Sequence, residues 1–206
     1  MDGIDGIAAS EALSASAGGA LLYAIAAPQA DGWTMALVFA AAASGFLVWN
    51  RPPARIFMGD VGSGFVGIAL AAMSLHASTV STSLFWGWLI LIGVFVVDAS
   101  MTLVRRVLRA ERVWNAHRTH AYQHAALRWG THGGVTLAVV CINVFWLLPL
   151  ACLVALRRID EVTGLAVAYA PLVAGAVWLG AGVPISAVSA QTRSPRRSST
   201  GEKVGR

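Results

Sequence analysis

Three short segments of the 206-residue sequence carry the side chains most capable of chemistry. They are 1–6 (MDGIDG), 59–64 (GDVGSG) and 117–124 (HRTHAYQH). The first two place acidic side chains among glycines, whose turns allow backbone N–H groups and a phosphate to approach each other closely. The third brings histidines and an arginine together. Carboxylates, glycine turns and cationic side chains suit a divalent cation and a phosphorylated substrate.

The glycine-rich second segment contains one carboxylate, Asp60. Gly62, Gly64 and Gly67 match the pattern G-x-G-x-x-G, but a dinucleotide site needs a preceding strand, and a Pro-Pro loop precedes this turn. Asp60 would supply a hard oxygen ligand for a divalent cation that bridges a phosphate. On the alternative interpretation, Asp60 and Ser63 simply cap the helix that follows.

The histidine segment would place cationic side chains on one helical face. At helical spacing that face holds His117, His120, His124 and Arg128. A transition-metal site is one interpretation, but the adjacent arginines and the lack of a local cysteine or carboxylate favour binding of an anion such as a pyrophosphate. A basic loop that only sets membrane topology is the alternative.

Long apolar runs separate these segments. Hydrophobic residues make up 57% of the chain and charged residues only 12%, about half the charged fraction of a soluble domain, so we expect lipid as the solvent. The runs predict an all-α, polytopic transmembrane helix bundle of about six spans. The predicted spans are 13–27, 33–49, 64–75, 84–103, 135–156 and 165–183, of which the first and third need flanking residues to cross.

The basic residues orient the predicted bundle. Of the fifteen Lys and Arg residues, only Arg157 and Arg158 lie on one predicted side and all the others lie opposite. This predicts a multi-pass protein of the inner (plasma) membrane with both termini cytoplasmic. Residues 1–185 form the transmembrane region and 186–206 a disordered basic cytoplasmic tail. Because the basic residues lie between apolar runs, nucleic acid is not expected as a partner.

Three stretches resemble successive cytoplasmic motifs of one enzyme family. They are 1–8 (MDGIDGIA), 56–63 (IFMGDVGS) and 114–124 (WNAHRTHAYQH). The family is the polyprenyl-phosphate N-acetylhexosamine-1-phosphate transferases, glycosyltransferase family 4. The histidine motif looks most like that of the branch that initiates O-antigen. Three motifs in order on one side of a membrane are more specific than any one alone.

The resemblance implies transfer of an N-acetylhexosamine 1-phosphate from a UDP-sugar to undecaprenyl phosphate, with release of UMP, to begin a cell-surface polysaccharide such as lipopolysaccharide. It implies Mg²⁺ as cofactor, held by Asp60. The implied catalytic residues are Asp60, His117 and His120, and the implied substrate-binding residues are Asp2, Asp5, Gly62, Ser63, Arg118 and His124. The expected partners are UDP-N-acetylhexosamine, undecaprenyl phosphate and membrane lipid, and a homodimer is a candidate assembly.

The family also carries further spans and an Asp-Asp motif upstream of the first motif. We therefore expect the chain to correspond to the C-terminal portion of such an enzyme and to show little transferase activity alone. An inactive membrane scaffold stays open as an alternative. So does a transporter or channel that uses Asp98, an acidic residue within an apolar run that could equally pair with Arg105 or Arg109. Transporters, however, concentrate their polar features near mid-membrane.

Overall fold

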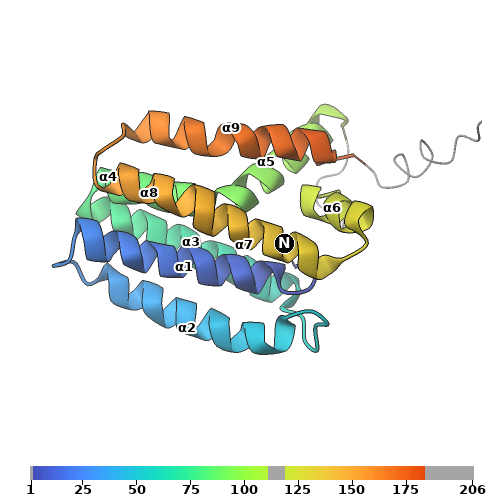
Figure 1. Cartoon of the computed structure of the whole chain (residues 1–206), viewed down its shortest axis with the longest axis horizontal. Helices are drawn as coiled ribbons and strands as arrows, with labels where there is room; N and C mark the ends of the chain where they lie inside the picture. The colour runs from blue at the N-terminus through green and yellow to red at the C-terminus, as the bar shows by residue number, and fades with distance from the viewer. Residues whose placement is uncertain (1, 111–118, 184–206) are drawn as a thin grey trace, which may run out of the picture.

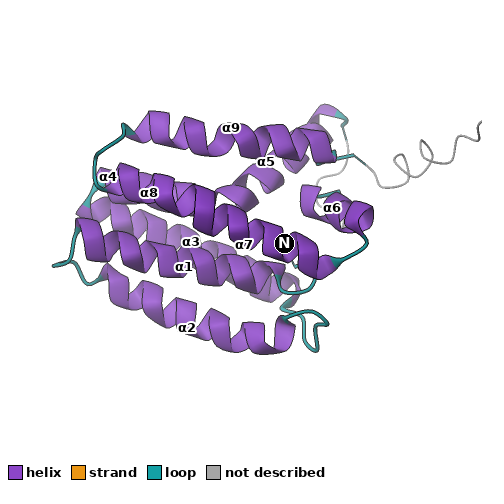
Figure 2. Cartoon of the chain, in the orientation of Figure 1, coloured by secondary structure: helices purple, strands orange, loops and turns teal. Residues whose placement is uncertain are grey.

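The computed structural model describes residues 2–110 and 119–183. Within these ranges the chain is helical, with short loops and no strand (Figure 2), which confirms the predicted all-α fold. His117, Arg118 and the predicted tail at 186–206 lie outside the described residues.

The helices follow one another closely along the chain. In order they are α1 (Ile7–Ala26), α2 (Gly32–Asn50), α3 (Gly59–Val80), α4 (Thr82–Leu91), α5 (Gly93–Leu108), α6 (Ala121–Trp129), α7 (His132–Ile142), the π-helical turn η1 (Asn143–Leu147), α8 (Leu148–Ala155) and α9 (Glu161–Leu179).

The described helices provide four to five candidate membrane spans rather than the six predicted. Four of them, α2, α3, α9 and the continuous segment α7–η1–α8, are each long and apolar enough to cross a bilayer. The pair α4–α5 makes a fifth if it counts as one span, although the two helices meet at 69°. The predicted short third span lengthens to 22 residues, as its flanking residues allowed.

Helix α1 corresponds to one predicted span that is absent from these candidates. It has 20 residues and α2 has 19, but those of α1 include Ser10, Glu11, Ser14 and Ser16, and α1 is not among the candidates. Most of its side chains from Ile7 to Tyr23 are buried, and α1 packs against α2, α3, α4, α7 and α8. A helix surrounded by protein can carry polar side chains that a lipid-facing helix cannot.

Small residues let α1 approach its neighbours. Gly19 lies directly against the indole of Trp88 in α4, which is fully buried, and Gly18 lies against Leu91. Gly87 of α4 in turn receives the side chain of Leu22. Because lipid provides no hydrophobic driving force between helices, such close packing is a main source of their association.

The described parts of the three segments with candidate chemistry lie at one end of the bundle. The N-terminal residues, the α2–α3 loop, α6 and the end of α9 come together there, on the right of Figure 1, whereas the loops before α2 and α9 lie at the opposite end. The helices cross the bundle back and forth, so every second connection returns to the same end. We call this the motif end.

The Gly19–Trp88 contact gives a stability prediction. Gly19→Ala would bring a methyl group into steric overlap with the indole ring of Trp88, and overpacking of this kind costs about 1–3 kcal/mol. We expect a lower unfolding temperature of the purified chain in mild detergent. Gly45→Ala in α2 is the matched control, because nothing lies near its Cβ position, and it should be neutral or stabilising. Equal effects of the two substitutions would contradict this description of the core.

Candidate functional site

The acidic N-terminal segment lies against the loop that leads into α3. The backbone N–H of Gly59 donates to Oδ2 of Asp2 over 2.9 Å. Gly59 has a φ of +71°, a left-handed conformation that glycine adopts without strain. The first and second motifs are therefore in direct contact, next to Asp60.

Asp5 is held from two other elements. Its Oδ2 accepts from the N–H of Ala54 over 3.3 Å, and its Oδ1 lies 3.2 Å from Nδ1 of His132. The backbone carbonyl of Asp5 also accepts from the hydroxyl of Thr136 over 2.7 Å. The sequence analysis did not identify His132 and Thr136 as site residues. The signal for them was their spacing of one helical turn at the start of α7, which places both on one face of the helix.

The first motif also contacts α6, which carries the histidine motif. A Cβ on Gly3 would lie 2.7 Å from the hydroxyl of Tyr122 and 2.6 Å from Nε2 of Gln123, so a larger residue would have to displace these side chains. Burial raises the pKa of Tyr122 above its usual range, and the charges of Asp98 and Asp2 act in the same direction. Tyr122 therefore keeps its proton. The first motif thus contacts both other motifs, the second through Asp2 and the third through Gly3.

Asp98 stabilises the start of α6 instead of pairing with Arg105 or Arg109. Its Oδ1 accepts from the N–H of Ala121, the first residue of α6, over 2.7 Å. Its Oδ2 lies 3.5 Å from Nδ1 of His120. An acidic group at a helix N-terminus is favourable because the first backbone N–H groups lack helical partners. This buried position does not suit the channel interpretation, since the carboxylate binds α6.

The predicted histidine stripe is not one continuous helical face. Helix α6 begins only at Ala121, and His120 has an extended backbone with ψ of 150°. His124 is buried, and its Nε2 donates to the carbonyl of Val183 over 2.9 Å. Arg128 lies 5.3 Å from the ring centroid of Trp178 in α9. His124 and Arg128 thus fasten α6 to the end of α9 rather than form an open anion site.

Arg105 in α5 and Arg109, which follows this helix, are also engaged with backbone groups. Nη1 of Arg105 donates to the carbonyl of Ala181 over 2.6 Å, and Nη1 of Arg109 donates to the carbonyl of Gly182 over 2.7 Å. These carbonyls follow α9, where cationic groups are favourable because the last carbonyls of a helix lack helical partners. Both arginines therefore hold the segment that follows α9.

Asp60 is the open carboxylate of the motif end. It is the second residue of α3 and is exposed, and no side chain caps this helix, whose N-cap is Met58. The hydroxyl of Ser63 donates to the carbonyl of Asp60 over 3.3 Å. The capping interpretation of Asp60 and Ser63 is thus wrong. Among the described residues, the carboxylate of Asp60 has no hydrogen-bond or ion-pair partner, and Gly62 beside it leaves room for the side chain of Met58.

The carboxylates could hold a magnesium ion together with a phosphorylated substrate. Among the described residues, no group of three His, Cys, Asp or Glu side chains has metal-ligand geometry. Oδ1 of Asp2 is nevertheless buried without a hydrogen-bond partner in the described part of the chain, beside the turn that carries Asp60. Mg²⁺ commonly uses only one or two carboxylates and completes its coordination with water and phosphate oxygens. The residues present therefore fit such an ion.

Comparison with known proteins gives consistent similarities. Residues 1–78 match the family model described as Glycosyl transferase family 4. The chain is 30% identical, over 155 residues, to a probable undecaprenyl-phosphate N-acetylglucosaminyl 1-phosphate transferase of Bacillus subtilis. The aligned region covers 70% of this chain and 40% of that protein. No solved structure matches the chain.

Other relatives carry a second name. A phospho-N-acetylmuramoyl-pentapeptide-transferase of Nostoc punctiforme is 48% identical over 102 residues, 47% of this chain and 25% of the relative. One of Chlamydia muridarum is 34% identical over 158 residues, 73% of this chain and 43% of the relative. The chain therefore spans less than half the length of each of these relatives.

The contact between Asp98 and Ala121 gives a prediction about α6. Asp98→Ala would leave the N–H of Ala121 buried without its acceptor, at a cost of about 1–3 kcal/mol. We expect faster amide hydrogen exchange throughout residues 121–129, measured by mass spectrometry. Asp98→Asn keeps an oxygen in the same place and should retain most of the protection. Unchanged exchange in Asp98→Ala would show that α6 is held by its other contacts alone.

Proposed function

Because the chain belongs to the polyprenyl-phosphate hexosamine-1-phosphate transferases of glycosyl transferase family 4, we propose that it carries part of a site for sugar-phosphate transfer. The site would move an N-acetylhexosamine 1-phosphate from a UDP-sugar to undecaprenyl phosphate and release UMP. One observation carries the proposal: residues 2–5 contact both the loop before Asp60 and the helix after His120. The acidic and histidine motifs can therefore act on one substrate.

The proposed reaction needs little acid–base chemistry. An oxygen of the lipid phosphate attacks the β-phosphorus of the UDP-sugar, a new P–O bond forms, and the bond to the bridging oxygen breaks so that UMP leaves. A phosphate monoester has a second pKa near 6 and is largely dianionic at neutral pH. A strong general base is therefore not required. Catalysis depends on positioning the phosphates and on stabilising their negative charge.

Different residues of the motif end would bind the metal ion, the nucleotide and the phosphates. Asp60 and Asp2 would hold Mg²⁺, which neutralises charge on the pyrophosphate when it is bound. Asp5, fixed by Ala54 and His132, would orient the nucleotide end of the donor. His120 would contact a phosphate from the start of α6.

Three further residues of the histidine motif complete the assignment. His117 and Arg118, which lie outside the described residues, would bind phosphate oxygens together with His120. His124 differs, because its bond to Val183 makes it a positioning residue of α6 rather than a substrate ligand.

The donor is proposed to be a simple N-acetylhexosamine, as in the initiation of O-antigen and related polymers. Support comes from the histidine motif and from the name of the Bacillus subtilis relative. A muramoyl-pentapeptide donor is the second candidate, because the relative from Nostoc punctiforme reaches 48% identity over 102 residues. UDP-N-acetylglucosamine and UDP-N-acetylmuramoyl-pentapeptide, assayed side by side, separate the two candidates.

The motif end is proposed to face the cytoplasm at the inner membrane, where nucleotide sugars are present. Six described arginines lie at this end, and two lie at the other. In a variant with Cys141 and Cys152 replaced by alanine, we expect a cysteine at Asp31 to react with an impermeant reagent in intact cells. A cysteine at Thr131 should react only after the cells are permeabilised. Both positions are exposed, and the reverse pattern would contradict the proposed orientation.

Asp60→Asn tests the metal and the reaction together. The substitution keeps the shape of the side chain but removes its charge, so Mg²⁺ binding should weaken and UMP release should fall by at least about a hundredfold, the usual scale for loss of a key electrostatic contact. The assay uses membranes in which the chain is co-expressed with the upstream segment of a relative, with UDP-N-acetylhexosamine, undecaprenyl phosphate and Mg²⁺.

Asp31→Asn is the matched control for this assay, because it removes an exposed carboxylate at the opposite end of the bundle and should leave the rate unchanged. Near-normal turnover of Asp60→Asn at saturating Mg²⁺ would exclude a role for Asp60 as ligand. UMP release that does not depend on undecaprenyl phosphate would argue against a transferase.

A further inference from the structure

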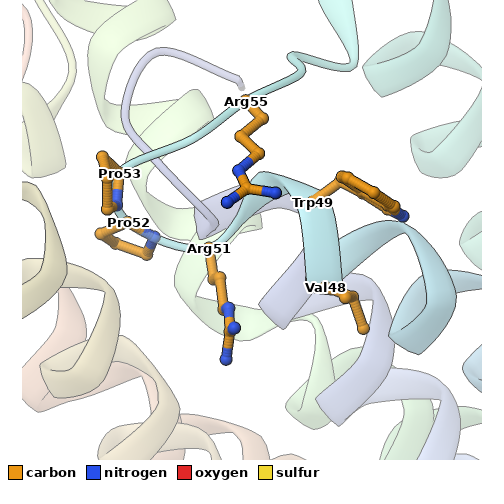
Figure 3. Close-up of a pocket in the computed structure, with 6 residues that line it drawn as sticks. All are labelled: Val48, Trp49, Arg51, Pro52, Pro53 and Arg55. Carbon is orange, nitrogen blue, oxygen red and sulfur yellow. The ribbon is translucent and has the colours of Figure 1, made fainter.

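A pocket of about 340 Å³ lies where α2 ends and the α2–α3 loop begins. It is lined by Val48, Trp49, Arg51, Pro52, Pro53 and Arg55 (Figure 3). None of these residues belongs to the proposed transferase site. The pocket is therefore a separate feature of the motif end.

The pocket carries positive charge and no negative charge. Arg51 and Arg55 line it, no carboxylate does, and neither arginine forms an ion pair with any described residue. Figure 3 shows Arg55 extending from the loop toward α2, where its guanidinium carbon lies 5.7 Å from the ring centroid of Trp49. Both arginines line the same pocket, and each guanidinium can donate two hydrogen bonds to an anion with several oxygens.

The pocket is held in shape by its backbone. The N–H of Arg55 donates to the carbonyl of Trp49 over 2.9 Å, and the N–H of Arg51 donates to the carbonyl of Leu47 over 2.8 Å. Pro52 and Pro53 restrict the loop between the two arginines. The arginines are thus presented from a short, closed loop rather than from a free strand of chain.

The apolar side of the pocket is exposed on a candidate membrane span, where lipid would contact it. Val48 and Trp49 are exposed at 59% and 51%, on the last turn of a helix that is a candidate membrane span. Tryptophan side chains at such positions lie at the depth of the lipid headgroups. A ligand that combines an anionic head with an apolar body would contact both sides of the pocket.

We propose that this pocket binds the phosphate of an anionic phospholipid headgroup. Arg51 and Arg55 donate to the phosphate oxygens, and Val48 and Trp49 contact the glycerol and upper acyl region. Ala54, between the two arginines, donates its N–H to Asp5. The bound lipid would therefore also hold the loop that fixes Asp5 in the site.

A pocket at the opposite end provides the natural comparison. It has a similar volume of about 320 Å³ and contains Arg157, but Asp160 and Glu161 line it as well. Those carboxylates oppose the binding of an anion. Arg157 and the adjacent Arg158 thus serve as a matched control pair for Arg51 and Arg55.

The test measures lipid binding to the full chain purified in a neutral detergent. Phosphatidylglycerol, phosphatidylcholine and the soluble headgroup analogue glycerol 3-phosphate are titrated separately, and bound ligands are counted by native mass spectrometry. We expect phosphatidylglycerol to bind with the highest affinity. The double variant Arg51→Gln/Arg55→Gln should bind it roughly thirtyfold more weakly, and Arg157→Gln/Arg158→Gln should match the unmodified chain.

Three results would overturn the proposal. Phosphatidylglycerol affinity that is unchanged in Arg51→Gln/Arg55→Gln would place the lipid elsewhere. Equal affinity for phosphatidylcholine would remove the role of net charge. Binding of glycerol 3-phosphate as tight as that of phosphatidylglycerol would show a site for soluble phosphate instead of a membrane lipid. Because UMP release is not measured, these outcomes are independent of the proposed transferase activity.

Discussion

The bilayer supplies no hydrogen bonds, and this constraint organises the whole molecule. Polar side chains and irregular backbone must either be buried within protein or lie at the ends of the spans. Helix α1 uses the first solution, since Glu11 is buried and its Oε2 accepts from Nδ2 of Asn143 over 2.6 Å. The acidic and histidine motifs use the second solution. Because consecutive helices cross back and forth, these motifs, distant in sequence, meet at one end of the bundle.

The motif end is built by charged side chains that bind backbone groups. Asp2, Asp5 and Asp98 each accept from a backbone N–H of another segment, and Arg105 and Arg109 each donate to a backbone carbonyl. Hydrogen bonds to charged groups contribute about 1.5–3 kcal/mol each. Because the partner is a backbone group, each bond also fixes the position of the segment that carries that group. These contacts leave Asp60 exposed, which is why this carboxylate is the best candidate for chemistry.

The α2–α3 loop connects the membrane surface to that site. Buried Asn50 donates from Nδ2 to the carbonyl of Ile56 over 2.7 Å, and the N–H of Ala54 binds Asp5. Arg51 and Arg55 project from the same loop toward the headgroup region. This short loop therefore has a lipid-facing side, with Arg51 and Arg55, and a site-facing side, with Ala54. A displacement of the arginines can reach Asp5 through the hydrogen bond of Ala54.

The sequence determined the all-α fold, because apolar runs of about 20 residues have the length of membrane-spanning helices, in which every backbone N–H and C=O is hydrogen-bonded within the helix. It also placed the acid-glycine segments at helix ends. Only the tertiary structure decided which groups the charged side chains bind. Helical periodicity states which residues share a face but not what lies opposite, so it could not choose between Arg105 and the N–H of Ala121 for Asp98. The same limit applies to His132, which binds Asp5 only because α7 packs beside α1. Hydropathy likewise could not show that α1 is enclosed by its neighbours, because burial depends on how distant segments pack.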